Sequence, residues 1–421
     1  MKQFWEIFRL EIRAIVRSRA LALLLAASAG WMFAMPYLVK SDGTEEGARQ
    51  MYVQYALGGV FAIVVVSLVA AAAGSLAKDR AGKRLQLTQV RPVRFMTMAL
   101  GRIAAFAATG AFVLAVAAGI LAARVELSRP CDHVLSPVME SPQAEAERMY
   151  EEYMKDPDTP KEVREAPKDD VVRILRQRAS EHYQEIPTNA VESWTFALPA
   201  REAEAAVAVR LKFTNMYDVR EDVAGTFLLG GMSGVVSNVT KSVTKVPLAG
   251  AAESLAAGEG RILFRNEGKG AVMLRPRRDI NLLVGADTFA WNLVRAWTEL
   301  VSLLTLSVAF AVFLGGSLGR STAVFTALTM LAIAVLSPAV IEECPYEVDT
   351  THGDRIGLAL THFARAATSP FSAVTPLEHL AADECVECSE VFRTFAVDFV
   401  ALPLAFAFLA ALVIPRKQEG V

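Results

Sequence analysis

Apolar residues in this chain gather into blocks that are long enough to cross a lipid bilayer. The hydrocarbon core, roughly 30 Å thick, requires about 20 mostly apolar residues in one helix. Six stretches approach this length: Ala20–Val39, Tyr52–Ala77, Ile103–Ala123, Ala296–Leu318, Thr322–Ile341 and Ala396–Ile414. The pattern predicts a polytopic α-helical membrane protein with six transmembrane helices.

A different pattern precedes the first block, within residues 1–19. Apolar positions recur there at spacings of three or four, and mainly basic residues lie on the other side: Phe4, Phe8, Ile12 and Ile15 against Lys2, Glu6, Arg9, Arg13 and Arg17. Such a helix lies in the headgroup plane and directs its cations toward anionic lipid. We expect an interfacial amphipathic helix; the alternative is a plain basic leader that sets the topology.

Positive charge indicates the orientation of the spans. Lys and Arg concentrate in 1–19, 78–102 and the C-terminal tail, whereas the loop 342–395 is mainly acidic. Because short cytoplasmic loops carry an excess of cations, both termini are expected to be cytoplasmic. The stretch 124–295 and the loop 342–395 then lie outside, and the protein is expected in the cell (inner) membrane.

The long charged stretch 124–295 has no span of its own and is expected to form an extracytoplasmic domain. Its first part has the composition of two helices, Gln143–Met154 and Asp169–Gln184, separated by prolines. Further on, apolar residues alternate with polar ones, as in short strands: Trp194, Phe196 and Leu198; Val207, Val209, Leu211 and Phe213; Ile262 and Phe264; Ile280, Leu282 and Val284. We predict an inserted α+β domain, with a helical arm plus a β-sandwich-like unit, and leave 230–250 open between strands and a loop.

These segments define the predicted domain organisation. It comprises the interfacial amphipathic helix (1–19), transmembrane helices 1–3 with the cytoplasmic loop 78–102 (20–123), the extracytoplasmic domain (124–295), transmembrane helices 4–5 (296–341), an extracytoplasmic loop (342–395) and transmembrane helix 6 with the cytoplasmic tail (396–421).

Composition narrows the functional classes. Of 421 residues, 53% are hydrophobic and 21% charged, and the mean hydropathy is +0.34. These values exclude a purely soluble enzyme. The formal net charge of −2 offers no basis for binding nucleic acid.

All four cysteines, Cys131, Cys344, Cys385 and Cys388, fall in the segments expected outside. This distribution suits structural disulfides in an oxidising compartment, with Cys344 linked to Cys385 or Cys388. A redox-active C-x-x-C pair and a metal site completed by His352 or His379 remain alternatives. Neither has a second supporting motif, so no metal ligand is assigned.

Charged residues inside the predicted spans are candidates for function, because ionisable groups in a bilayer are costly. They are Arg295, Glu299 and Asp398. The alternative is structural: Arg295 can pair with Glu299 four residues along the helix, and Asp398 can stay hydrated near the interface. The chain contains no recognised catalytic motif, so no catalytic residue is assigned.

The cytoplasmic loop 78–102 is the most informative stretch. Apolar residues stand among its cations, and a proline interrupts it before the next span. The features are Asp79 to Gly82, Leu85-Gln86-Leu87, Arg91-Pro92-Val93-Arg94 and Gly101-Arg102. In this order they resemble the permease subunits of type-2 ABC exporters, although Lys83-Arg84 stands where Thr is common and Arg102 where Lys is usual. A simple positive-inside anchor is the alternative.

The resemblance implies a transporter subunit whose first cytoplasmic loop couples it to an ATPase. The coupling residues would be Leu85, Leu87, Val90, Arg91, Pro92, Val93 and Arg94. No G-x-x-x-x-G-K-[ST] motif occurs, so this chain itself would bind no cofactor and hydrolyse no ATP; ATP and Mg would sit on an ABC ATP-binding subunit. Other expected partners are a second permease, as homodimer or heterodimer, membrane lipid and an extracytoplasmic protein.

Two other functions stay open. One is a membrane subunit whose ATPase moves the outer domain mechanically without translocating a substrate. The other is a membrane-anchored thiol redox protein that uses Cys385 and Cys388.

Overall fold

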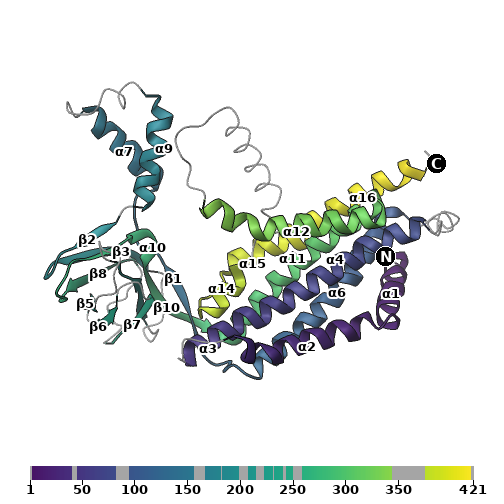
Figure 1. The fold of residues 1–421 in the computed structure, drawn as a ribbon, viewed down its shortest axis with the longest axis horizontal. Helices are drawn as coiled ribbons and strands as arrows, with labels where there is room; N and C mark the ends of the chain where they lie inside the picture. The colour runs from purple at the N-terminus through teal and green to yellow at the C-terminus, as the bar shows by residue number, and fades with distance from the viewer. Residues whose placement is uncertain are drawn as a thin grey trace. The chain divides into compact units, whose positions relative to one another are not determined.

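The computed structural model describes residues 2–39, 45–81, 94–155, 166–181, 183–198, 207–214, 222–230, 232–239, 243–249, 258–343 and 375–418. The chain divides into two compact units (Figure 1). A helical unit comprises Met1–Arg129 and Thr288–Val421, and a second unit comprises Pro130–Asp287.

Among its described residues, the helical unit contains five apolar helices of membrane-spanning length. They are Ala20–Leu38, Gly47–Asp79, Phe95–Ala122, Phe289–Ser317 and Cys388–Val413. These helices coincide with five of the predicted spans and are consistent with a polytopic membrane protein. The remaining predicted span lies within α12 (Arg320–Glu343), whose described apolar part, Arg320–Ile333, is shorter.

The described part of the helical unit contains the following helices, in chain order. The chain begins with α1 (Lys2–Arg17), followed by α2 (Ala20–Leu38). The second apolar helix is built from α3 (Glu45–Tyr52), the π-helical η1 (Val53–Leu57) and α4 (Gly58–Ala81), and the third is α6 (Phe95–Ala122). The C-terminal part comprises α11 (Phe289–Ser317), α12, α14 (Thr375–Ala381), α15 (Cys388–Thr394), π-helical η4 (Phe395–Ala401) and α16 (Leu402–Gln418).

Helix α11 forms the centre of the helical unit. It packs against α4, α6, α12 and α16, and 83% of its most apolar window is buried, against 22% for α2 and for the last span. Close packing requires Gly315, because a Cβ atom there would lie 2.4 Å from the backbone oxygen of Ala73 on α4. Because close-packed helices transmit strain, a displacement of α4 or α6 would also displace α11.

The second unit is built on two four-stranded sheets, with strand orders β1-β10-β4-β7 and β3-β8-β5-β6, and a two-stranded sheet β2-β9. The strands are β1 (Pro130–Leu135), β2 (Gln184–Ile186), β3 (Val191–Leu198), β4 (Val207–Lys212), β5 (Asp222–Leu229), β6 (Met232–Val239), β7 (Val243–Leu248), β8 (Gly258–Asn266), β9 (Val272–Leu274) and β10 (Ile280–Thr288). Alternate residues of both large sheets, among them Phe196, Val209 and Phe264, meet in one buried core. The predicted alternating strands are confirmed.

The stretch 230–250, left open by its sequence, contributes β6 and β7. Strand β6 pairs antiparallel with β5, and β7 pairs antiparallel with β4, so the two strands extend different sheets. Val236 and Val246 enter the shared core. Long-range pairing, rather than local pattern, makes this stretch strand.

Two helices of the second unit pack against each other, α7 (Pro142–Lys155) and α9 (Lys168–Glu181) (Figure 1). Ala146, Val171, Val172 and Leu175 form their contact. Both predicted helices are confirmed, but α9 ends at Glu181, before the expected Gln184. Gln184 instead opens β2, where it pairs with Leu274 of β9.

Candidate functional site

Three helices of the helical unit meet at one buried arginine. Arg102, near the start of α6, is only 6% exposed. Its Nε atom lies 3.0 Å from Oε1 of Glu11 on α1, and its Nη2 donates to Oδ2 of Asp79 near the end of α4. We call Glu11, Asp79 and Arg102 the arginine cluster.

Local packing brings α1 close enough for this cluster to form. The adjacent Gly101 faces α1, and a Cβ atom there would lie 2.8 Å from Cγ2 of Ile7. Burial raises the pKa of Glu11, a shift that Arg102 opposes and Asp79 reinforces. The cluster therefore holds two carboxylates around one guanidinium, and the carboxyl group of Glu11 binds a proton more readily than a solvent-exposed one would.

Two residues of the arginine cluster flank the segment that is expected to couple to an ATPase, residues 85–94. Asp79 precedes that segment and Arg102 follows it. Among the predicted coupling residues the structure describes only Arg94, an exposed residue with extended backbone directly before α6. The others, Leu85, Leu87, Val90, Arg91, Pro92 and Val93, lie outside the described residues.

A second polar cluster holds the segment between α14 and α15 against α11. Asn292 is fully buried; its Nδ2 donates to the backbone oxygen of Glu384 (2.7 Å), and its Oδ1 accepts from the backbone nitrogen of Val386 (2.8 Å). Arg295 donates through Nη1 to the oxygen of Val386 (3.4 Å). A side-chain amide thus satisfies backbone groups that would otherwise be buried unpaired.

Ion pairs fix the same segment from a second side. Arg49 of α3 makes a bidentate contact with Asp383, with Nη-to-Oδ distances of 2.7 and 2.5 Å, and Nη2 of Arg129 lies 3.7 Å from the same carboxylate. Nδ1 of His379 lies 2.8 Å from Oε2 of Glu384. Together, the Asn292 hydrogen bonds and these ion pairs connect α3, α11 and α14 through the segment between α14 and α15.

The two described cysteines of the C-x-x-C pair differ in exposure. Cys385 is buried beside the Asn292 contact and Cys388 is exposed at the start of α15, while Cys344 and His352 lie outside the described residues. Within the described ranges, no group of three His, Cys, Asp or Glu side chains is arranged to hold a metal ion. The disulfide, metal and redox readings stay predictions.

The predicted membrane-embedded acids are both buried. Glu299 on α11 is 3% exposed, and its Oε1 has no hydrogen-bond partner among the described residues. Asp398 on η4 is 7% exposed, which differs from the expectation of a hydrated side chain. The difference arises because Asp398 turns into the helical unit, where η4 packs against α11.

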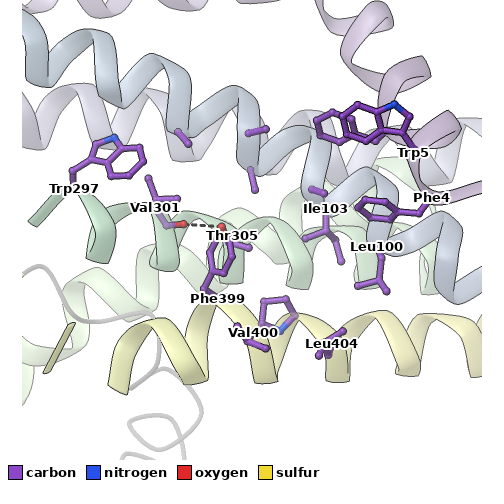
Figure 2. Close-up of a pocket in the computed structure, with 16 residues that line it drawn as sticks. Phe4, Trp5, Leu100, Ile103, Trp297, Val301, Thr305, Phe399, Val400 and Leu404 are labelled. Atoms are coloured by element: carbon purple, nitrogen blue, oxygen red, sulfur yellow. Dashed lines mark hydrogen bonds between the residues drawn. The ribbon is translucent and has the colours of Figure 1, made fainter. Parts of the chain in front are cut away.

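An apolar groove of about 650 Å³ runs along the other side of these helices (Figure 2). Its walls come from α1, α6, α11, η4 and α16, and include Phe4, Trp5, Ile103, Val301 and Phe399. Thr305 turns its hydroxyl to the backbone oxygen of Val301 (2.7 Å), which leaves an apolar surface. The groove suits an apolar occupant such as an acyl chain.

Sequence reasoning did not find Asn292, Asp383 or the arginine cluster. An amide near the end of a predicted span was the one available signal for Asn292. The partners of Asp383 and Arg102 are distant in the chain, so no local pattern could reveal them.

Comparisons with protein-family models, with curated proteins and with solved structures find no match to this chain. The resemblance to type-2 ABC exporter permeases therefore rests on the loop 78–102 and the order of the spans.

Proposed function

We propose that this chain is the transmembrane permease subunit of an ABC-type export complex, driven by a separate ATP-binding subunit that docks on the loop 78–102. The observation that carries the proposal is the arginine cluster, in which Arg102 ties the two flanks of this loop to α1. A force applied to the loop would be delivered to α1, α4 and α6 together.

The contacts of α11 suggest how such a force would continue. Helix α11 packs against both α4 and α6, and its Asn292 holds the segment 384–386 at the other end. Because tightly packed helices move as bodies rather than deform continuously, closure of the ATPase would shift α11 and this segment together.

The proposal includes a topology. In this topology the chain crosses the inner membrane six times, with α12 as the fifth span. Both termini are cytoplasmic and the unit Pro130–Asp287 is outside; the support is the concentration of Lys and Arg in 1–19, 78–102 and the C-terminal tail. A second permease completes the complex. ATP and Mg belong to the partner subunit, and the chain itself acts as a transporter rather than an enzyme.

Purification from native membranes tests the proposal. The wild-type chain should retain a protein with a nucleotide-binding motif and show ATP hydrolysis. Replacing Arg91-Pro92-Val93 with Ala-Gly-Ala should release that protein or uncouple its hydrolysis, while Arg17→Ala, an exposed cation on α1, should not. Unchanged retention and activity in the loop variant would remove the coupling role.

A mechanical function without translocation is the second candidate. It is favoured by the connection of Pro130–Asp287 at both of its ends, to α6 and to α11, two helices that pack against each other. Relative sliding of these helices would pull on both connections. A structure of the assembled complex decides between the candidates, because export requires a cavity that crosses the membrane and the mechanical function does not.

A further inference from the structure

A pocket of about 610 Å³ lies between α1, α2, α4, α6 and the start of α12, all in the helical unit. One part of its wall is apolar and includes Leu21, Leu24, Ile63, Leu68 and Phe106. The other part carries charge, on Glu11, Lys78 and Arg320. We call this cavity the amphipathic pocket. The groove in Figure 2 differs from it, because none of the residues that line that groove is charged.

The amphipathic pocket has the length of one lipid leaflet. Ile63 in its apolar part and Lys78 in its charged part both belong to α4, and fifteen residues of helix correspond to about 22 Å along the axis. A bilayer with its headgroups is about 40–45 Å thick, so one leaflet measures about 20–22 Å. Ala70, Ala71 and Gly74 line the pocket between these two positions, and their small size leaves its volume open.

Two cations lie together at the charged end. Lys78 follows Gly74 by four residues, so both lie on the same side of α4, about 6 Å apart along the axis. Arg320 reaches over Gly74 from α12, and its Nε atom lies 3.5 Å from the place that a Cβ atom of Gly74 would occupy. Among the described residues, neither the Lys78 ammonium nor the Arg320 guanidinium has an ion-pair or hydrogen-bond partner. Two positive charges are therefore available to one anion.

Most other polar groups of the pocket are already engaged. Glu11, the one acidic residue in its wall, has its Oε1 atom 3.0 Å from Nε of Arg102. Three of the four hydroxyl groups donate to backbone oxygens three or four residues earlier in the chain: Ser18 to Ile15, Ser75 to Ala72 and Thr109 to Ala105. The charged end thus has a surplus of positive charge, and both Lys and Arg side chains bind phosphate oxygens.

We propose that the amphipathic pocket binds one anionic phospholipid, with its phosphate at Lys78 and Arg320 and an acyl chain against α2 and α4. The apolar wall is stabilised by burial of an acyl chain, and the two unpaired cations are stabilised by an anion. A phospholipid supplies both in one molecule, whereas free phosphate supplies only the charge. The bound lipid holds α2 and α12 against α4. The inference does not depend on an ATPase or on export.

Photolabelling of the full chain in lipid nanodiscs tests the site. The probe is a phosphatidylglycerol with a diazirine in its acyl chain, added to nanodiscs of phosphatidylcholine, and labelled peptides are located by mass spectrometry. The label should concentrate on the pocket residues of α2 and α4. Unlabelled phosphatidylglycerol should displace it more effectively than added phosphatidylcholine, and inorganic phosphate should not displace it. In the groove of Figure 2 the two lipids should compete equally, because that groove offers no cation.

Removal of the two cations should weaken binding of the probe. In Lys78→Gln/Arg320→Gln, the mole fraction of probe that gives half-maximal labelling should rise about 30-fold, at about fivefold for each cation near an anionic lipid. The charge-matched control is Arg13→Gln/Arg17→Gln, which removes two exposed cations of α1 that do not line the pocket and should keep the wild-type value.

A second variant fills the pocket instead of removing its charge. Ala71→Leu should abolish labelling of the pocket, whereas Ala62→Leu, at an exposed position of α4 outside the pocket, should not. Label spread evenly over the apolar helices would overturn the proposal, as would equal displacement from the pocket by the two lipids. So would equal shifts in the two double variants, since these would assign the preference to the general charge of the surface. Displacement by inorganic phosphate would also overturn it, because the apolar wall would then have no role in binding.

Discussion

Arg102 is the residue on which α1, α4 and α6 converge. Its guanidinium balances two carboxylates that are themselves largely buried, with side-chain exposures of 19% for Glu11 and 25% for Asp79. Breaking a buried ion pair by removing one partner leaves uncompensated charge, which is the costly case.

We predict that Arg102→Met destabilises the helical unit by about 3–5 kcal/mol, the typical cost of removing one partner from a buried pair. Thermal unfolding in nanodiscs measures the change. Arg13→Met, an exposed cation on the same helix as Glu11, serves as the control and should change stability by less than about 0.5 kcal/mol. Equal effects of the two variants would show that the cluster has no structural role.

The raised pKa of Glu11 predicts a pH dependence. Its folded value lies above the ordinary 4.5 because burial disfavours the charged form, so the folded chain binds more protons there than the unfolded chain. The contribution of Glu11 to the free energy of unfolding is therefore complete at a pH below its ordinary pKa. It is lost as the pH rises from the ordinary pKa through the raised pKa of the folded chain.

Glu11→Gln should therefore flatten the decline of stability with rising pH over that window. The measurement is the unfolding temperature as a function of pH for wild type and variant. A steeper decline of the unfolding temperature in the variant would contradict the assignment of this pH dependence to Glu11.

At the scale of elements, Asn292 joins α11 to the segment between α14 and α15. Asn292→Leu keeps the approximate size of the side chain but leaves the buried groups of Glu384 and Val386 without their partner. We expect a loss of about 1–3 kcal/mol for each buried group left unsatisfied, and faster hydrogen exchange at the Val386 amide.

The matched control is Thr298→Val on the same helix. The half-buried Thr298 donates its hydroxyl to the backbone oxygen of Val294 in its own helix (2.8 Å), so its loss should leave exchange at Val386 unchanged. If exchange at Val386 is equally fast in both variants, Asn292 does not hold the segment.

At the scale of the whole molecule, the second unit has its own core and its two ends are adjacent. Strands β1 and β10, which begin and end Pro130–Asp287, are neighbours in one sheet. Phe264 packs against two other aromatic residues of this core: its ring centroid lies 5.1 Å from the ring centroid of Phe213 and 4.6 Å from that of Phe227.

We therefore predict that residues 130–287 fold alone and unfold cooperatively. Circular dichroism should report β-structure with a single thermal transition. Phe264→Ala should lower stability by about 3–5 kcal/mol, whereas Val235→Ala, on the exposed side of β6, should have little effect. A non-cooperative transition of the unmodified fragment would contradict this independence.

The sequence by itself determined five apolar helices of spanning length, the amphipathic α1, the helices α7 and α9 and the alternating strands, because each depends on a local pattern of apolar and polar residues. It also drew attention to Glu299 and Asp398, since acids are rare in apolar blocks. Only the tertiary structure decided that β6 and β7 belong to different sheets, that Asp398 is buried and that Arg102 joins Glu11 to Asp79. These features depend on pairings between distant parts of the chain, and hydrophobic periodicity carries no information about which distant side chain completes a buried polar group.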